Sequence, residues 1–263
     1  MLDLIDPAVI GGTLAAILLV GILFALASGR WIGKRTIARH GLATLPSAGS
    51  LEAAVFALLG LIIAFTFSGA LSRFDTRRAQ IVDEANAMGT AYLRIDLVPA
   101  SLQPKLRETF RSYVDSRIET YRRLPDLAAA KASLARSQEL QGEIWSQAIA
   151  AVRMPGGPPM AELLVLSALN EMFNFTTIRT SATLMHPPAI VYAMLIGLAL
   201  AAALLAGYQS AGERAYDWVH QIAFAATVTF TVYVILDIEY PRLGFVRIDA
   251  VDQVLVNVRQ GMK

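Results

Sequence analysis

Four long apolar stretches constrain this chain more than any other feature, because a run of about 18 or more apolar residues without charge is typical of a membrane-spanning helix. The stretches cover approximately residues 8–28, 53–71, 189–208 and 221–236. The fourth is the shortest, but Trp218 and Tyr240 flank it with aromatic rings suited to the two membrane interfaces. Composition agrees, since 55% of the residues are hydrophobic and only 17% are charged, against about a quarter in soluble domains.

The flanks of the first stretch indicate an anchor that stays in the protein rather than a cleaved signal peptide. Asp3 and Asp6 precede it, whereas a secretory signal begins with basic residues. The basic residues follow it instead, as Arg30, Lys34, Arg35 and Arg39. By the positive-inside rule, this pattern favours residues 30–50 in the cytoplasm, and the segments after the second and fourth spans in the periplasm. The basic residues counted near all the span ends do not decide between this orientation and the reverse, so the side of the insert stays open.

A polar insert separates the second and third stretches. Residues 72–186 hold 14 of the 23 basic and 12 of the 21 acidic residues. Apolar residues recur there every three or four positions, which predicts helices. Pro99 ends the first of them, Ser101 is a candidate N-cap of the next, and Asp126 opens a third. Residues 154–159, Met-Pro-Gly-Gly-Pro-Pro, are expected to form a loop.

The expected fold is therefore an all-α integral membrane protein with four transmembrane helices and a helical extramembrane bundle between the second and third. The expected division of the chain is a first transmembrane hairpin, the insert, a second hairpin and a C-terminal tail with a short amphipathic segment. These parts comprise residues 1–71, 72–186, 187–237 and 238–263.

Little in the sequence predicts catalysis. The chain has no cysteine and three histidines, so neither a metal site nor a cofactor is predicted, and no nucleotide-binding or hydrolase motif occurs. A net charge of +2 is too balanced to indicate a nucleic-acid partner. Asp83 and Glu84 are adjacent carboxylates, which do not face each other on a helix, and they are expected on a solvated helix face. The chain is not expected to be an enzyme.

The second stretch carries the main functional signal. It continues without a helix breaker into a charged segment, and Ala57, Leu61 and Phe65 lie four residues apart on one face. In a symmetric oligomer such a stripe would form stacked apolar rings, which can gate conduction by dewetting. Rings of Arg73 and Arg77 would then set the field at one mouth. Two simpler interpretations stay open: a stop-transfer boundary, and an apolar stripe that faces lipid or a neighbouring helix.

Residues 59–65, Leu-Gly-Leu-Ile-Ile-Ala-Phe, followed by Arg73-Phe74 and then Arg77, resemble the second-helix signature of bestrophins. A bacterial family of unknown function, known as bestrophin-like, is more similar and matches over about residues 50–260. Further similar segments are residues 65–68, 73–75, 82–86, 89–94, 169–172, 186–188 and 235–244.

The resemblance implies a homopentameric ion channel with four spanning helices per subunit and a neck formed by the second helix. Ala57, Leu61 and Phe65 stand at the matching neck positions, and of these Phe65 keeps the usual aromatic residue. Vertebrate bestrophins also carry an acidic calcium-binding cluster after the fourth helix. Asp237 and Glu239 are the only acids available there, so calcium activation is not expected. The bestrophin resemblance implies that the helical insert faces the cytoplasm, which is the reverse of the orientation that the positive-inside rule favours.

Two functional hypotheses follow. The first is a homo-oligomeric channel for small inorganic ions in the bacterial inner membrane, whose partners are the lipid bilayer and other copies of itself. Its pore would be lined by the second span, and Asp83, Asp237 and Glu239 are candidate ion-interacting acids. The charges do not decide between anions and cations. The second hypothesis is a non-conducting membrane scaffold or sensor whose helical insert binds a partner.

Overall fold

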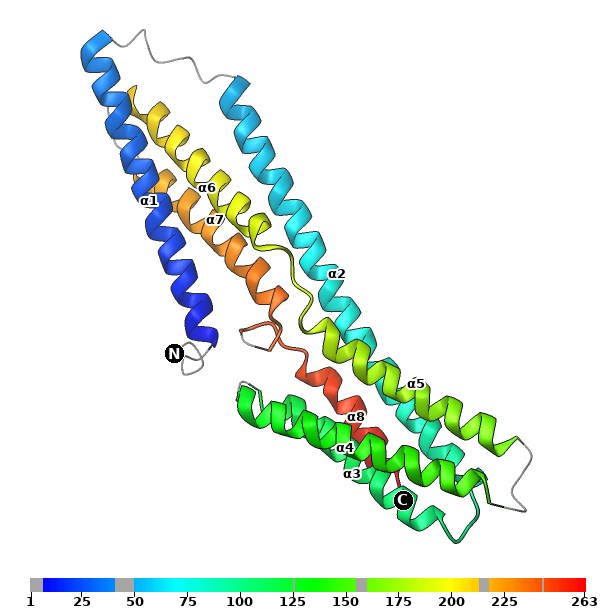
Figure 1. Ribbon diagram of the computed structural model, residues 1–263. Coiled ribbons are helices and arrows are strands. Elements are labelled where there is room, and N and C mark those ends of the chain that lie inside the picture. Colours follow the sequence, from blue (N-terminus) through cyan, green and yellow to red (C-terminus); the bar gives the residue numbers. More distant parts are fainter. Residues whose placement is uncertain (1–6, 41–49, 125, 155–159, 213–217, 243) are drawn as a thin grey trace. The chain divides into compact units, whose positions relative to one another are not determined.

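The computed structural model describes residues 7–40, 50–124, 126–154, 160–212, 218–242 and 244–263, with side chains from residue 11 in the first helix and residue 52 in the second. Within these ranges the regular structure is helical and contains no strand (Figure 1). The α-helices are α1 (Pro7–His40), α2 (Ser50–Arg94), α3 (Gln103–Arg122), α4 (Leu127–Val152), α5 (Ala161–Ala182), α6 (Ala189–Gln209), α7 (Trp218–Glu239) and α8 (Asp249–Gly261). The predicted all-α fold is confirmed.

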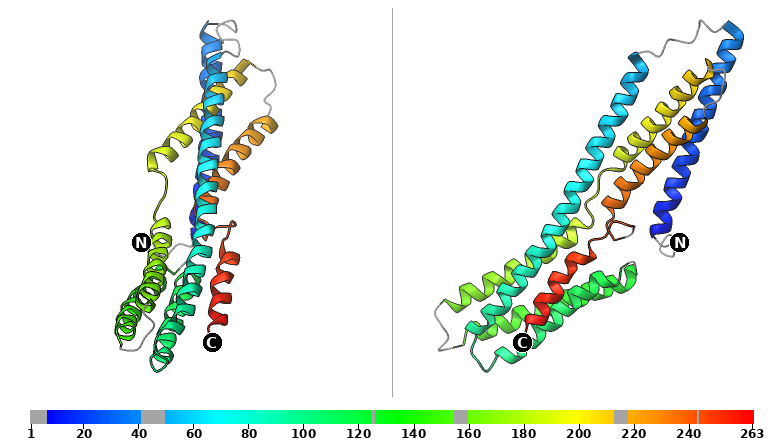
Figure 2. Two further views of the ribbon diagram at one scale, coloured as in Figure 1. Left: turned by 90° about the vertical axis from the view of Figure 1, so that its right-hand side faces the viewer. Right: turned by 180° about the vertical axis from the view of Figure 1, so that it is seen from behind.

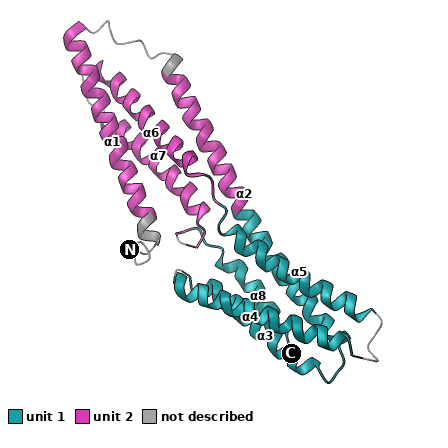
Figure 3. Ribbon diagram, viewed as in Figure 1, with its two compact units in different colours: residues 1–4, 74–185, 246–263 teal, residues 5–73, 186–245 magenta. Residues whose placement is uncertain are grey.

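The described chain divides into two compact units (Figure 3). The membrane unit comprises residues 7–73 and 186–245, and the polar unit comprises residues 74–185 and 246–263. α2 is one continuous helix of 45 residues that contributes its first part to the membrane unit and its second part to the polar unit. The unit boundaries at 73/74, 185/186 and 245/246 compare with predicted boundaries at 71/72, 186/187 and 237/238.

In the membrane unit, α1 packs against both α6 and α7 (Figures 1 and 2). α1 and α6 approach closely because glycines stand where their backbones meet. A Cβ atom on Gly29 would overlap the carbonyl oxygen of Leu204, and one on Gly207 would overlap that of Leu26. Gly33 follows Gly29 by four residues, which is the spacing that lets membrane helices pack backbone to backbone.

Four helices are long and apolar enough to cross a membrane: α1, α2, α6 and α7. Their outer surfaces carry exposed apolar side chains such as Phe24, Ile190 and Phe230, as expected where lipid rather than water is the neighbour. The protein is therefore a multi-pass membrane protein.

The polar unit has a conventional apolar core made by the second part of α2 together with α3, α4, α5 and α8. Phe110, Tyr113, Ile144 and Met172 are fully buried in it. α8 is the amphipathic segment that the sequence predicts in the tail. Leu255 is buried in the same core, and Arg259 pairs with Asp115 of α3 at 2.8 Å.

Some local predictions are confirmed and others are wrong. Asp126 caps α4 by accepting a hydrogen bond of 3.0 Å from the Ala129 amide. Ser101 does not cap α3, whose N-cap residue is Leu102 without a side-chain bond, because Pro104 already presets the first turn. α1 extends past the predicted end at residue 28 to His40, so the basic residues from Arg30 to Arg39 lie on a helix. Of the predicted loop at 154–159, residues 155–159 lie outside the described residues.

Candidate functional site

Within the membrane unit, α2 is held by one face. Glu52 accepts a hydrogen bond from Gln209 of α6, and the Phe56 ring packs edge-on against Phe224 of α7 with centroids 6.0 Å apart. Further along, Ala70 is fully buried. Since successive helical residues are rotated by about 100°, these positions define a single packed face.

The opposite face of α2 carries the three residues predicted to line a pore. Ala57 is exposed, Leu61 is 50% exposed and Phe65 is 66% exposed. Ser68 and Ser72 continue this exposed face at helical spacing, and beyond them come Asp75, Asp83 and Asn86, which are exposed as well. We call these eight positions the open face of α2. It changes from apolar to polar after Phe65. The charges among the eight are two carboxylates, and one of them, Asp75, pairs with the exposed Arg78 at 3.5 Å.

Arg73 lies on the packed face rather than the open face. Its Nε and NH2 atoms donate to Glu239 Oε2 at 2.9 and 2.7 Å. Glu239 is fully buried, and its Oε1 atom lies 3.0 Å from His186 Nδ1. The Tyr240 ring stacks on His186 with centroids 4.5 Å apart. Glu239 therefore compensates the charge of Arg73, which reduces the field that this arginine could set at a pore mouth.

Arg77 is also on the packed face, and it is buried. Its guanidinium donates to the carbonyl oxygens of Ala182 at 3.3 Å and Met185 at 3.0 Å. Ala182 is the last residue of α5 and Met185 lies in the segment that follows it, so the arginine satisfies one of the last helical carbonyls, which have no helical partner, and one beyond the helix. Both arginines expected at the mouth thus make packing contacts within the subunit.

The three acids predicted to interact with ions differ in their exposure to solvent. Asp83 is exposed on the open face. Asp237 is buried and accepts a hydrogen bond of 3.0 Å from the Phe245 amide. Gly244 is required beside it, because a Cβ atom there would overlap the Asp237 carboxylate. Asp237 and Glu239 therefore organise the turn after α7, and within the described residues no group of three potential ligands is placed to hold a metal.

Glu84 corrects the expectation of a solvated pair, because its neighbour Asp83 is exposed while Glu84 is fully buried. Arg117 Nε donates to Glu84 Oε1 at 2.8 Å, and Arg179 NH1 donates to Oε2 at 2.6 Å. Arg179 NH2 also reaches Asp252 of α8 at 2.7 Å. This Glu84 network joins α2, α3, α5 and α8. The spacing of Ile81, Ala85 and Met88 is the sequence signal that Glu84 shares their buried face.

The charges in this network compensate one another. Burial lowers the pKa of Arg117, but the Glu84 carboxylate, together with Tyr121 and Tyr113, raises that pKa above its usual range. Burial raises the pKa of Tyr113 to about 12, so its phenol stays neutral and bonds Thr176 at 2.6 Å. Two carboxylates and two guanidiniums give no net charge, and the network stabilises the polar unit rather than presenting charge to a ligand.

These features define a class: a multi-pass, all-helical membrane protein with a long second helix that is packed on one face and open on the other. The chain belongs to the family described as Bestrophin-like domain, whose model matches residues 15–252. That family is one of bestrophin-type channels.

The fold is also that of solved bestrophin homologues. One variant of a bacterial bestrophin homologue from Klebsiella pneumoniae superposes with a TM-score of 0.70 at 12% identity, covering 93% of this chain and 95% of that chain. A second variant gives 0.68 at 12% identity, covering 93% and 98%. At this identity the likeness shows the fold alone. No curated protein is significantly similar in sequence.

Proposed function

We propose that the chain is the subunit of a homo-oligomeric ion channel in the bacterial inner membrane, with the open face of α2 lining the pore. The observation that carries the proposal is the division of α2 into a packed face and an open face. A helix that already satisfies its polar and aromatic contacts on one side can turn the other toward an axis shared by several subunits. A pentamer is the assembly that the bestrophin resemblance implies.

The order of residues along the open face suits a gated pore. Ala57, Leu61 and Phe65 would form successive apolar rings, and such constrictions gate by dewetting. Each step of four residues advances about 6 Å along a helix, so the three rings would span a short hydrophobic neck. The serines and carboxylates beyond Phe65 would line a hydrated vestibule.

The charge of the open face favours cations. Rings of carboxylates are typical of cation-selective pores. Asp83 is exposed there, whereas the charge of Asp75 is offset by the exposed Arg78, 3.5 Å away. Arg73 and Arg77, which would favour anions, lie on the packed face, where Arg73 pairs with Glu239 and Arg77 donates to the carbonyl oxygens of Ala182 and Met185. Inorganic cations are thus the substrate class that the geometry supports best.

The most direct functional experiment compares two phenylalanines of α2. Phe65 lies on the open face, whereas Phe67, two residues further on, points to another side of the helix and is 39% exposed. In liposome flux or planar-bilayer recordings, Phe65→Ala should raise conductance several-fold by removing an apolar ring, while Phe67→Ala should leave it near that of the unaltered protein.

The outcomes separate the two functional hypotheses. Absence of current from intact oligomers, with neither substitution producing any, would overturn the channel proposal in favour of a scaffold or sensor. A monomer or dimer in detergent would have the same consequence, because too few α2 helices would be present to enclose a bestrophin-type pore.

We further propose that the polar unit faces the periplasm, as the basic end of α1 favours. The chain has no cysteine, and Met154 at the end of α4 is exposed. A Met154→Cys protein should therefore react with a membrane-impermeant thiol reagent in intact spheroplasts. Labelling only after the membrane is permeabilised would place the polar unit in the cytoplasm instead.

A further inference from the structure

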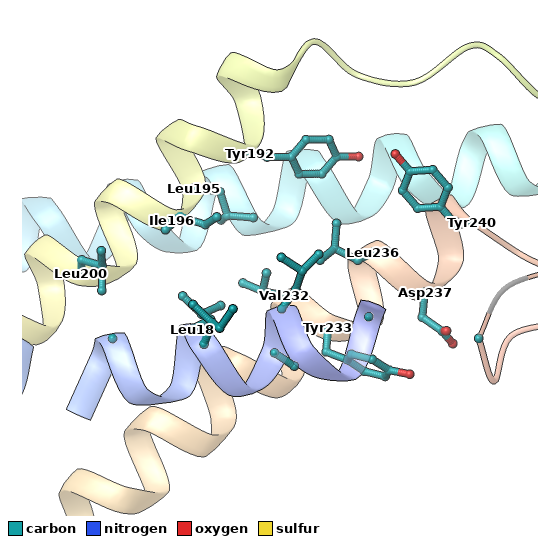
Figure 4. Close-up of a pocket in the computed structure, with 16 residues that line it drawn as sticks. Leu18, Tyr192, Leu195, Ile196, Leu200, Val232, Tyr233, Leu236, Asp237 and Tyr240 are labelled. Carbon is teal, nitrogen blue, oxygen red and sulfur yellow. The ribbon is translucent and has the colours of Figure 1, made fainter. Parts of the chain in front are cut away.

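A cavity of about 610 Å³ lies within the membrane unit between α1, α6 and α7 (Figure 4). Its size falls within the range of about 300–1,000 Å³ that is usual for small-molecule sites. No residue of the open face of α2 or of the Glu84 network is among its described lining residues, although Asp237 and Tyr240 are.

Most of the cavity wall is aliphatic. Leu18, Leu195, Leu200 and Val232 supply side chains to it from the three helices. Gly21 leaves part of the α1 wall without a side chain, and a Cβ atom there would lie 3.4 Å from Leu200 Cδ2. Because all three helices are apolar enough to cross a membrane, the occupant of this region is expected to be apolar as well.

The cavity can be reached from the side. Leu14 and Ile17 belong both to its lining and to the exposed surface of α1, where they are 50% and 63% exposed. An alkyl chain lying among lipid tails could therefore enter between the helices without first crossing water.

One end of the cavity is polar. The hydroxyl groups of Tyr192 and Tyr240 point toward one another there (Figure 4), and Tyr233 and Asp237 belong to the same end. Asp237 is the only ionisable acid on the wall, and no lysine, arginine or histidine is among the described lining residues. Phenol and carboxylate oxygens accept hydrogen bonds, whereas an anionic head group would meet a carboxylate of like charge.

We propose that this cavity binds the alkyl chain of an amphipathic molecule whose head group is neutral or cationic and donates hydrogen bonds at the tyrosine and Asp237 end. Such a ligand matches the aliphatic wall with its tail and the acceptor-rich end with its head. The same chemistry could come from a two-chain membrane lipid or from a free single-chain amphiphile.

The test uses photoreactive probes in which one diazirine-bearing alkyl chain carries an ammonium, a hydroxyl or a carboxylate head. The full-length protein is labelled in phosphatidylcholine nanodiscs, and adducts are mapped by peptide mass spectrometry. The ammonium and hydroxyl probes should label α1, α6 and α7 about tenfold more than the carboxylate probe, a ratio that corresponds to about 1.4 kcal/mol. A carboxylate probe that labels equally or better would overturn the proposed head-group chemistry.

Two neighbouring alanines provide a matched pair. Ala15 lines the cavity, whereas Ala16 is exposed on another side of α1. Ala15→Phe should fill the space and abolish labelling, and Ala16→Phe should leave it unchanged. Equal labelling of the two variants would contradict the proposed location.

Head-group selection is tested separately with Asp237→Asn, which keeps an acceptor oxygen for the Phe245 amide but removes the charge. This variant should lose the preference for ammonium over carboxylate, and an unchanged preference would contradict the role of Asp237. If a variant fails to fold, labelling of the wild-type protein is measured in the presence of unlabelled alkylammonium or unlabelled alkylcarboxylate. The alkylammonium should reduce labelling more, and equal reduction would contradict the proposed head-group preference.

The source of the ligand follows from one further probe. Labelling by a phosphatidylethanolamine with the diazirine in one acyl chain would identify a bilayer lipid as the occupant. Labelling only by the single-chain probes would identify a free amphiphile. Absence of labelling by every probe would overturn the proposal, whether or not the protein conducts ions.

Discussion

The two faces of α2 differ in what surrounds them, although they belong to the same helix. The packed face holds Arg73 against Glu239, Arg77 against the end of α5, and Glu84 against Arg117 and Arg179. The open face holds alanine, leucine, phenylalanine, serines and exposed acids. Strong pairing on one side indicates that the packed face stabilises the subunit, and exposure on the other is the basis for proposing that the open face lines a pore.

The contrast between the faces also explains why the sequence pattern alone places the arginines at a pore mouth. Ala57, Leu61, Phe65, Arg73 and Arg77 are all separated by multiples of four residues. A step of four turns a helix by about 40° beyond one full rotation, so a row of this kind drifts around the axis. From Ala57 to Arg73 the drift is about 160°, which carries the row from the open face to the packed face.

The largest effect is expected from replacing Glu84 on the packed face, which should lower the stability of the protein. Glu84→Gln leaves Arg117 and Arg179 buried with a neutral partner, and loss of one member of a buried ion pair costs about 3–5 kcal/mol. The melting temperature of the purified protein should fall markedly. Asp83→Asn changes the adjacent residue on the open face and should leave the melting temperature unchanged; equal falls in both variants would contradict the assignment of the two faces.

A smaller loss of stability is expected at Arg73. Arg73→Met removes a cationic partner from the buried Glu239 carboxylate, which also lies 3.0 Å from His186. The side chain of Arg73 is 33% exposed, so the expected cost is about 1–3 kcal/mol, measured as a lower melting temperature. Ser68→Ala, on the open face, should cost almost nothing. A larger loss from Ser68→Ala than from Arg73→Met would reverse the roles of the two faces.

The smallest effect is expected on ion selectivity. Asp83→Asn removes one carboxylate per subunit from the open face, so the reversal potential in a salt gradient should move by a few millivolts away from the cation value. Glu171→Gln removes the same charge from an exposed position on α5 and serves as the control. Equal shifts from both variants would indicate a general surface-charge effect rather than a pore ring.

The sequence is sufficient to predict the features that depend on local patterns. The four spans follow from apolar runs, the unbroken second helix from the lack of a breaker, and the Asp126 cap from its position before a helix. Tertiary partners are a different matter, because they are far apart along the chain. Glu84 meets residues 33 and 95 positions away, and Arg73 meets one 166 positions away.

Cysteine accessibility along α2 tests the central claim that its open face lines an ion pathway. The chain has no native cysteine, so single cysteines can be placed at Ala57, Leu61, Phe65 and Ser68, and at Leu59 and Ala70 on the packed face. A water-soluble thiol reagent applied during conductance recordings should block current at the first four positions and not at the last two. Block at the packed positions, or at none of the six, would contradict the account.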